Sequence, residues 1–377
     1  MKLKNILLCA SVLGAWHSLH VPEILDEDRN PNSLDPENFW KSESDILKGL
    51  TAAYAGLQPT IEWAQPFERY IVIDNYRSDE LDYRPDVTAW MELAMYNNES
   101  TNYVPNDEWT NLYTSINYCN QCLDNIPNVP DNDDEGIKQT KATSIAEARF
   151  LRAFYYYRLF INFGERLPMF EHELEGTEEE FYPPQVEAGR LKTFIETELS
   201  ECQANLPEKW NTNMAGRVTK YTAAALLGKY YMFIGEKAKA KTEFWKVIDS
   251  HRYELMENYG DNFNGLHENN KESILEVQFT GSLEGGHYEY NLFTLHLGPD
   301  SGCGAYEEAY PSKWLFNTLK KDLHRRWGNT ATDCMRLSFS TIPNPVRSIT
   351  KTAKDSVITT KKTISLAQIC DLRQVIG

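Results

Sequence analysis

The chain has 377 residues, of which 41% are hydrophobic and 12% aromatic, so it can build a sizeable core and is not a disordered protein. The formal net charge is −17, which argues against nucleic-acid binding, because phosphates require a basic surface. No apolar run reaches the roughly 18 to 20 residues that span a bilayer, so we expect a soluble body.

The first twenty residues predict a secretory signal peptide. Lys2 and Lys4 form a short basic head, and the apolar run ILLCASVLGA follows at residues 6–15. Cys9 lies inside this run, directly after Leu8, where a lipidated cysteine is not expected. We therefore assign residues 1–20 to a signal that is removed or unstructured.

Helical periodicity dominates residues 40–250, with one helical hairpin expected to begin at 45–57 and another near 189–206. The stretch WTNLYTSINYCNQC begins at Trp109, and AEARFLRAFYYYRLFINFGERLP spans 146–168. Ala146, Phe150 and Ala153 have the spacing of the second helix of a tetratricopeptide repeat. We expect Phe154, Tyr157 and Ile161 to continue its buried face, and Arg149 and Arg152 to pair with an acidic neighbouring helix. The turn-rich segment NIPNVPDNDDEG predicts an enlarged loop between these two helices.

Residues 223–248 predict a helical hairpin. Six positions match the repeat signature: Leu227, Gly228, Tyr231, Gly235, Ala240 and Phe244. Gly228 and Ala240 are small where we expect the two helices to approach closely, and Gly235 is expected to end the first helix. The sequence thus predicts a mainly α-helical fold of stacked tetratricopeptide-like hairpins with an irregular ligand-binding part.

Aromatic side chains interleaved with polar ones occupy residues 63–109. Flat rings flanked by carboxylates, amides and guanidinium groups suit sugars, which present an apolar C–H face and a rim of hydroxyls. The predicted contacts are Trp90, Tyr83, Tyr96, Asn97, Arg84 and Asp79. A second cluster, GGHYEYNLFTLHLGPDSGCGAY at 285–306, adds Tyr288 and Tyr290 in an expected exposed loop. Packing between helices is the competing interpretation of every one of these rings.

No catalytic or metal motif is found. There is no metalloprotease, nucleophile-elbow or phosphate-loop pattern, and no cofactor is predicted. Cys119 and Cys122 are predicted to be ordinary helix positions, and DNDDEG lacks the coordinating residue that a calcium loop requires at its last position, Ala142. We predict no metal site and no enzymatic activity.

The order of segments resembles the SusD/RagB family of outer-membrane nutrient-binding lipoproteins of Bacteroidetes. The segments that carry the resemblance are LDEDRNPNS, FWKSESDILKGLTAAYAGL, the helix from Trp109, AEARFLRAFYYYRLFINFGERLP, GRVTKYTAAALLGKYYMFIGE and YELMENYGDNFNGLHENNKESILEVQF. The resemblance implies a glycan as ligand, held in the same two aromatic regions. It also implies a TonB-dependent outer-membrane barrel of the SusC type as partner.

Two departures from the family stand out. The lipidated cysteine that the family carries before the Leu25–Asp26–Glu27 motif is not found. The resemblance implies a surface location at the outer membrane through a lipid anchor, and we expect a secreted or periplasmic location if that anchor is absent. Residues 320–377 hold 11 basic and 4 acidic side chains in an otherwise acidic protein. We expect a SusD-like domain over 21–323 and a poorly ordered, truncated or frame-shifted tail over 324–377.

Three functions follow as hypotheses. The first is non-catalytic glycan capture for delivery to the transporter. The second is a tetratricopeptide adaptor that binds protein or peptide in its groove, and the third is a glycoside-processing enzyme. Binding of a polysaccharide without release of reducing ends distinguishes the first from the other two.

Overall fold

The computed structural model describes residues 39–58, 68–174, 181–263, 265–279, 293–297, 305–318 and 363–365. Two units are distinguished, Met1–Lys41 and Ser42–Gly377. In the first unit the rings of Phe39 and Trp40 meet edge to face, with centroids 4.9 Å apart. The predicted signal peptide lies outside the described residues, and the described helices and strands all belong to the second unit.

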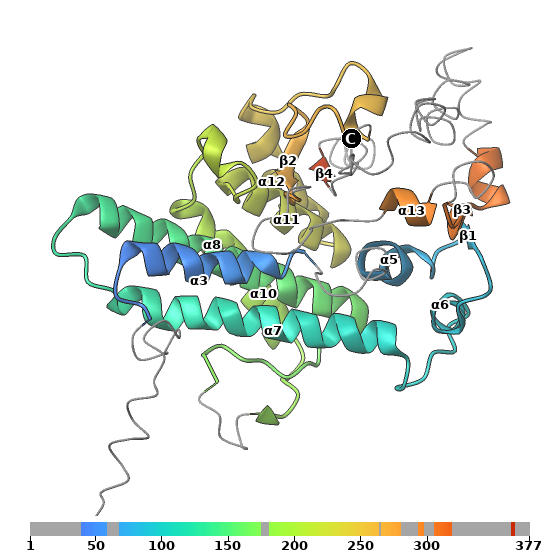
Figure 1. The fold of residues 1–377 in the computed structure, drawn as a ribbon, viewed down its shortest axis with the longest axis horizontal. Coiled ribbons are helices and arrows are strands. Elements are labelled where there is room, and N and C mark those ends of the chain that lie inside the picture. The colour runs from blue at the N-terminus through green and yellow to red at the C-terminus, as the bar shows by residue number, and fades with distance from the viewer. Residues whose placement is uncertain are drawn as a thin grey trace, which may run out of the picture. The chain divides into compact units, whose positions relative to one another are not determined.

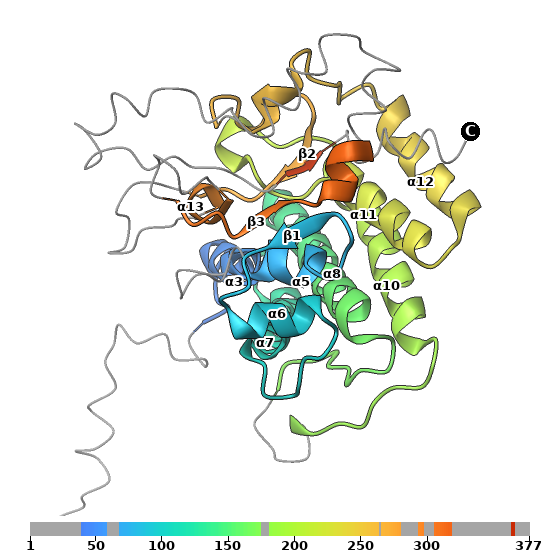
Figure 2. The ribbon, with the colours of Figure 1, turned by 90° about the vertical axis from the view of Figure 1, so that its right-hand side faces the viewer.

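Long helices form the scaffold of the second unit (Figures 1 and 2). They are α3 (Glu43–Ala55), α7 (Tyr103–Asn125), α8 (Glu135–Phe163), α10 (Arg190–Glu201), α11 (Lys220–Phe233) and α12 (Lys237–Asp249). The shorter helical elements are η1 (Glu68–Val72), α5 (Ile73–Asn75), α6 (Thr88–Ala94), η2 (Ile126–Asn128), η3 (Cys202–Ala204), η4 (Thr212–Met214), η5 (Tyr259–Asn262) and α13 (Phe293–Leu297). The predicted mainly α-helical fold is confirmed.

Two short antiparallel ribbons complete the described elements. β1 (Leu81–Tyr83) pairs with β3 (Ala309–Pro311) in the register Leu81 to Pro311 and Tyr83 to Ala309. β2 (Ser273–Glu276) pairs with β4 (Thr363–Ser365), with an irregularity between Ser273 and Leu275. β4 comes from the region predicted as a tail, and the predicted boundaries 1–20, 21–323 and 324–377 remain a prediction.

The α11–α12 hairpin confirms the predicted repeat positions. A Cβ atom added to Gly228 would lie 2.4 Å from the Phe244 ring, so only glycine permits this approach of the two helices. Leu227, Tyr231 and Ala240 are buried beside this contact. Gly235 follows α11 with φ +87°, a left-handed conformation in which an L side chain is strained.

The α7–α8 hairpin differs from the prediction in its connection. α7 continues to Asn125, and α8 already begins at Glu135, well before Ala146. The side chain of Asp134 accepts hydrogen bonds from the backbone N–H groups of Gly136 and Ile137, so it caps α8. The predicted enlarged loop is therefore wrong: most of the extra chain lengthens the two helices, because an acidic turn residue serves as a helix cap.

α8 lies between other helices and is buried on more than one face. Ala146, Phe150 and Ala153 are buried as predicted, but Tyr155, Tyr156 and Leu159 are more deeply buried than the expected continuation at Phe154, Tyr157 and Ile161. The predicted buried face of α8 is too narrow, because α3, α7, α10 and α11 all contact this helix.

The two arginines of α8 form the predicted ion pairs. Arg149 Nη2 donates to Glu198 Oε1 at 2.7 Å, and Arg152 Nη2 donates to Glu198 Oε2 at 2.8 Å. Arg149 also reaches Glu201 Oε2 at 2.6 Å. Both acidic residues belong to α10, so one buried carboxylate of α10 joins two guanidinium groups of α8.

Candidate ligand-binding surface

A peripheral module, defined here as residues 68–102, 293–297 and 305–318, lies beside the helical scaffold. Figure 1 shows α5, α6, β1, β3 and α13 gathered at one side of the long helices. The module has a hydrophobic cluster that it shares with Val104 of α7. The members from the module are Val72, Ile73, Tyr76, Trp90, Leu93 and Ala309. The chain segment between α3 and α7 therefore folds together with a segment more than 200 positions later, as the β1–β3 pairing requires.

Buried charges fasten this module to the scaffold. Arg158 of α8 donates to the two carboxylate oxygens of Asp74 at 2.8 and 2.7 Å, and to Glu108 Oε1 at 2.8 Å. Its Nη2 also donates to the carbonyl oxygen of Arg69 at 2.9 Å. Burial disfavours the charge of Arg158, but the carboxylates of Glu108 and Asp74 outweigh that effect and raise the pKa of the guanidinium group. The arginine stays charged and fixes α5 against α8.

Trp90 is a core residue of the module. Its side chain is 3% exposed, and its indole Nε1 donates to Glu68 Oε1 at 2.9 Å. The Tyr103 hydroxyl donates to the same oxygen. Burial raises the pKa of the Glu68 carboxyl, although the hydrogen bonds from Tyr103 and Trp90 act in the opposite direction. This placement argues against the predicted contact between Trp90 and a ligand, because neither the ring nor its N–H is available.

Tyr83 and Arg84 lie where β1 meets β3. The Tyr83 ring stacks on the Tyr76 ring at 5.2 Å between centroids. Arg84 Nη1 donates to the carbonyl oxygen of Tyr306 at 2.7 Å, and its Nε donates to Asp86 at 2.8 Å. Arg84 thus bridges the two parts of the module, a role that sequence spacing could not reveal. Contact of Tyr83 or Arg84 with a ligand stays a prediction.

Asp79 lies just before β1 with an exposed side chain. Its carbonyl oxygen accepts a hydrogen bond from Ser312 Oγ at 2.7 Å, which adds another tie between the two parts of the module. The backbone of Asp79 is therefore structural, while the carboxylate remains open to solvent. A role for that carboxylate in binding stays a prediction.

Tyr96 is the most exposed of the predicted aromatic residues that the structure describes. It is 72% exposed, and its backbone has φ +56°, which is uncommon for a residue other than glycine. Its hydroxyl donates to the carbonyl oxygen of Arg77, so the side chain is tethered at its far end while most of its surface faces solvent. Asn97, next in sequence, is also exposed. Contact of Tyr96 or Asn97 with a ligand stays a prediction, and the exposed ring of Tyr96 is accessible for such a contact.

The second predicted region reaches the same module. The backbone N–H of Tyr306 donates to the carbonyl oxygen of Leu295 at 2.8 Å, and that of Glu308 donates to the His296 carbonyl at 2.9 Å. The buried imidazole of His296 also pairs with the Glu308 carboxylate. The structure thus brings together segments from both aromatic regions, although Tyr288 and Tyr290 themselves lie outside the described residues.

The exposed aromatic residues of this module that sequence reasoning missed include Tyr310 and Trp314. Tyr310, on β3 opposite Asp82, is 40% exposed, and Trp314 is 54% exposed. Both lie just beyond the predicted cluster at 285–306. The signal that could have found Tyr310 is Pro311, because proline in a strand indicates an edge whose side chains remain accessible.

Within the described part of the chain, no group of three or more His, Cys, Asp or Glu side chains is placed to hold a metal ion. Over the same residues, no helix combines the length and the apolar character that crossing a membrane demands. Cys119, Cys122 and Cys202 are free, buried thiols.

Comparison with known protein families identifies the family of this chain. A family model described as "Starch-binding associating with outer membrane", of the SusD-like type, matches residues 25–232, more than half of the chain. The chain belongs to the SusD-like family. The matched range of this SusD-like chain contains the scaffold from α3 into α11 and the first part of the peripheral module.

Curated relatives cover a large share of the SusD-like chain. SusD-like protein P25 of Formosa agariphila is 26% identical over 300 residues, which are 78% of this chain and 55% of that protein. SusD-like protein P38 of the same organism is 25% identical over 259 residues, or 68% of this chain and 48% of that protein. The SusD-like chain thus spans about half the length of these relatives.

Solved structures share the fold of the SusD-like chain. A SusD superfamily protein from Bacteroides vulgatus aligns with TM-score 0.64 and 21% identity, covering 74% of this chain and 58% of that one. A laminarin-binding SusD-like protein aligns with TM-score 0.64 and 22% identity, covering 86% of this chain and 70% of that one. A SusD-like carbohydrate-binding protein from Bacteroides fragilis has TM-score 0.62 and 25% identity, covering 72% and 52%. The helical, tetratricopeptide-like scaffold is common to this family.

Proposed function

We propose that this chain is a non-catalytic glycan-binding protein of the outer membrane, which captures an oligosaccharide on its peripheral module. It would deliver that oligosaccharide to a SusC-like TonB-dependent barrel. The observation that carries the proposal is Tyr96, an exposed ring with a tethered hydroxyl, in a chain whose family is described as starch-binding. Asn97 beside it offers an amide that both donates and accepts hydrogen bonds.

The tether of Tyr96 matters for affinity. Because the hydroxyl already bonds to the Arg77 carbonyl, little side-chain entropy remains to be lost when a sugar stacks on the ring. Stacking that removes about 50 Å² of apolar surface from water contributes about 1 kcal/mol. Two or three such contacts with a few hydrogen bonds give a dissociation constant in the range of roughly tens of micromolar to millimolar. Weak capture suits a protein that passes its ligand on.

The binding proposal is tested with isothermal titration calorimetry and affinity electrophoresis. Laminarin is the first probe, because a related structure is of a laminarin-binding protein, and starch is the second, because of the family description. We expect Tyr96→Ala to weaken binding about fivefold, the effect of losing about 1 kcal/mol. The matched control is Tyr182→Ala, since Tyr182 is 84% exposed and lies in the connection between α8 and α10.

Distinct outcomes separate the competing functions. Binding without new reducing ends supports glycan capture, whereas release of reducing ends would indicate a glycoside-processing enzyme. If neither these probes nor a wider panel of polysaccharides binds, the adaptor hypothesis is favoured. Equal loss of affinity in Tyr96→Ala and Tyr182→Ala would reject the peripheral module as the binding surface.

Delivery to a transporter requires a test of its own. The chain, tagged and produced in its native cell, is isolated from outer membranes in mild detergent, and its companions are identified by mass spectrometry. We expect a TonB-dependent barrel in stoichiometric amount. A chain that binds glycan but is isolated without a barrel would refute delivery and leave glycan binding intact.

A further inference from the structure

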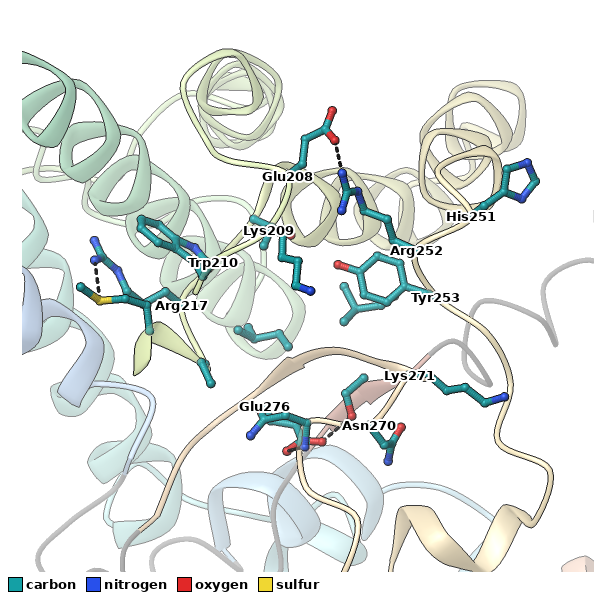
Figure 3. Close-up of a pocket in the computed structure, with 18 residues that line it drawn as sticks. Glu208, Lys209, Trp210, Arg217, His251, Arg252, Tyr253, Asn270, Lys271 and Glu276 are labelled. Carbon is teal, nitrogen blue, oxygen red and sulfur yellow. Dashed lines mark hydrogen bonds and ion pairs between the residues drawn. The ribbon is translucent and has the colours of Figure 1, made fainter. Parts of the chain in front are cut away.

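A separate cavity of about 480 Å³ lies away from the peripheral module. It is bounded by residues 208–219 before and at the start of α11, by 251–253 after α12, and by 269–276, which include β2. Its volume falls within the range of small-molecule sites in proteins. Figure 3 shows its lining side chains, among which basic ones outnumber acidic ones.

Most basic side chains of the lining are already neutralised. Arg252 pairs with Glu208. Arg217 Nε donates to Glu147 at 2.9 Å. Lys271 forms a third ion pair, with its Nζ 3.1 Å from Glu254 Oε2, and Figure 3 shows its side chain pointing away from the cavity.

Lys209 is different. Among the residues that the structure describes, Lys209 forms no ion pair with a carboxylate, and Figure 3 shows the ammonium group of this exposed side chain directed into the middle of the cavity. The hydroxyl end of Tyr253 points into the same space from the opposite side. Burial raises the pKa of the Tyr253 hydroxyl, although a hydrogen bond with Thr219 acts in the opposite direction. Like other tyrosine hydroxyls, it is protonated at neutral pH and can donate a hydrogen bond.

Fixed aromatic and apolar groups form the walls. Trp210 Nε1 donates to the carbonyl oxygen of Val218 at 2.7 Å, and the Arg217 guanidinium lies over its ring at 4.0 Å from the centroid. The Tyr253 ring packs edge to face on Tyr221 at 6.1 Å. Ile274 of β2 adds an apolar side chain. These walls are held in place without a ligand, which lowers the entropic cost of binding one.

A cavity with one unpaired cation, an opposing hydroxyl and apolar walls is suited to a compact organic anion. The whole chain carries −17, so an anion is repelled from most of its surface and needs a local positive charge. We propose that this cavity is a second binding site, specific for a sugar unit that carries a carboxylate or a sulfate. Lys209 and Tyr253 would hold the anionic group. The choice of a sugar as the carrier rests on the proposed function.

Calorimetric titration of the full chain with D-glucuronate, D-glucose 6-sulfate and D-glucose tests this site at low and high ionic strength. We expect at least one of the charged sugars to bind more tightly than glucose, with an affinity that falls as salt increases. Lys209→Met should weaken that binding about tenfold, because a hydrogen bond to a charged group is lost, and Tyr253→Phe about threefold. The comparison of glucuronate with glucose 6-sulfate identifies the preferred anion.

Two controls keep the result specific. Lys241→Met removes an exposed lysine of α12 outside the lining and should leave the affinity unchanged. Tyr96→Ala should also leave it unchanged, so loss of neutral-glycan binding at the peripheral module and loss of anion binding here can be told apart. Equal affinity for all three sugars, or an affinity that Lys209→Met does not alter, would overturn the proposal.

Discussion

Tyrosine hydroxyls are treated alike in the scaffold and in the peripheral module, but the rings are not. Tyr155 of α8 donates to the Ala53 carbonyl at 2.7 Å, and Tyr156 donates to the Phe170 carbonyl at 3.0 Å, with both rings fully buried. Tyr96 has the same kind of bond to the Arg77 carbonyl, yet its ring faces solvent. The same kind of hydroxyl bond therefore holds a buried ring in the scaffold and an exposed ring in the peripheral module.

The largest effect is expected when Trp90→Ala is compared with Tyr96→Ala. Trp90→Ala removes a buried ring and leaves Glu68 without one of its donors, so we expect the free energy of unfolding to fall by about 3–5 kcal/mol. Tyr96→Ala should change it by less than about 0.5 kcal/mol. Chemical denaturation followed by circular dichroism gives both values. Similar losses in the two variants would abolish the distinction between core and surface in this module.

Next in size is Arg158→Met, which breaks the junction between scaffold and module. It removes the guanidinium group that binds both Asp74 and Glu108, although Glu108 keeps its ion pair with Arg69, and we expect a loss of about 3 kcal/mol. Hydrogen exchange should quicken most in residues 68–97. Arg149→Met is the matched control in α8. It should cost less, because the Arg149 side chain is partly exposed, Glu201 is exposed, and the buried Glu198 keeps its ion pair with Arg152. A uniform change in exchange across the chain would contradict a local role for Arg158.

Gly228→Ala tests the scaffold alone. The added Cβ would lie 2.4 Å from Phe244, and the two helices must separate or the ring must move. We expect a loss of about 2 kcal/mol with no change in glycan affinity per folded molecule. Combining Gly228→Ala with Phe244→Leu should restore part of the stability. A double variant no more stable than Gly228→Ala would show that the clash is not with this ring.

The smallest expected effect concerns Glu68→Gln. Burial is the main cause that raises the pKa of Glu68 in the folded chain. The contribution of this group to the free energy of unfolding of the wild type is therefore fully present at acidic pH and is lost as the pH rises through the folded pKa. Glutamine can still accept the bonds from Trp90 and Tyr103 but does not titrate. We therefore expect Glu68→Gln to be at most about 1 kcal/mol more stable than wild type at neutral pH and to lose the advantage in acid. A stability difference that is independent of pH would contradict this account.

The sequence predicts the scaffold well because its determinants are local. Gly228, Ala240 and Phe244 satisfy a spacing that two adjacent helices impose, and Arg149 and Arg152 lie one turn apart on a helix that faces α10. The sequence predicts a loop at Asp134, where the structure has a helix cap, because the same residue types favour turns and helix starts.

The candidate site is harder to predict because its determinants are distant. Whether Trp90 packs or binds depends on Glu68 and on Ala309, which come from other elements of the module. Tyr96 and Trp90 sit in similar sequence surroundings, and only the folded module decides which ring stays outside. Arg84 likewise bonds to a carbonyl more than 200 positions away.

The position of α8 among four other helices sets the order in which backbone amides exchange with solvent. A helix that is covered on several faces has no partial opening that exposes it alone, so its amides exchange only when the whole scaffold opens. Amides around Tyr96 can exchange through small local motions instead. The slowest-exchanging amides of α8 would therefore report the global free energy of unfolding, and those of the peripheral module would report how readily the ligand surface rearranges.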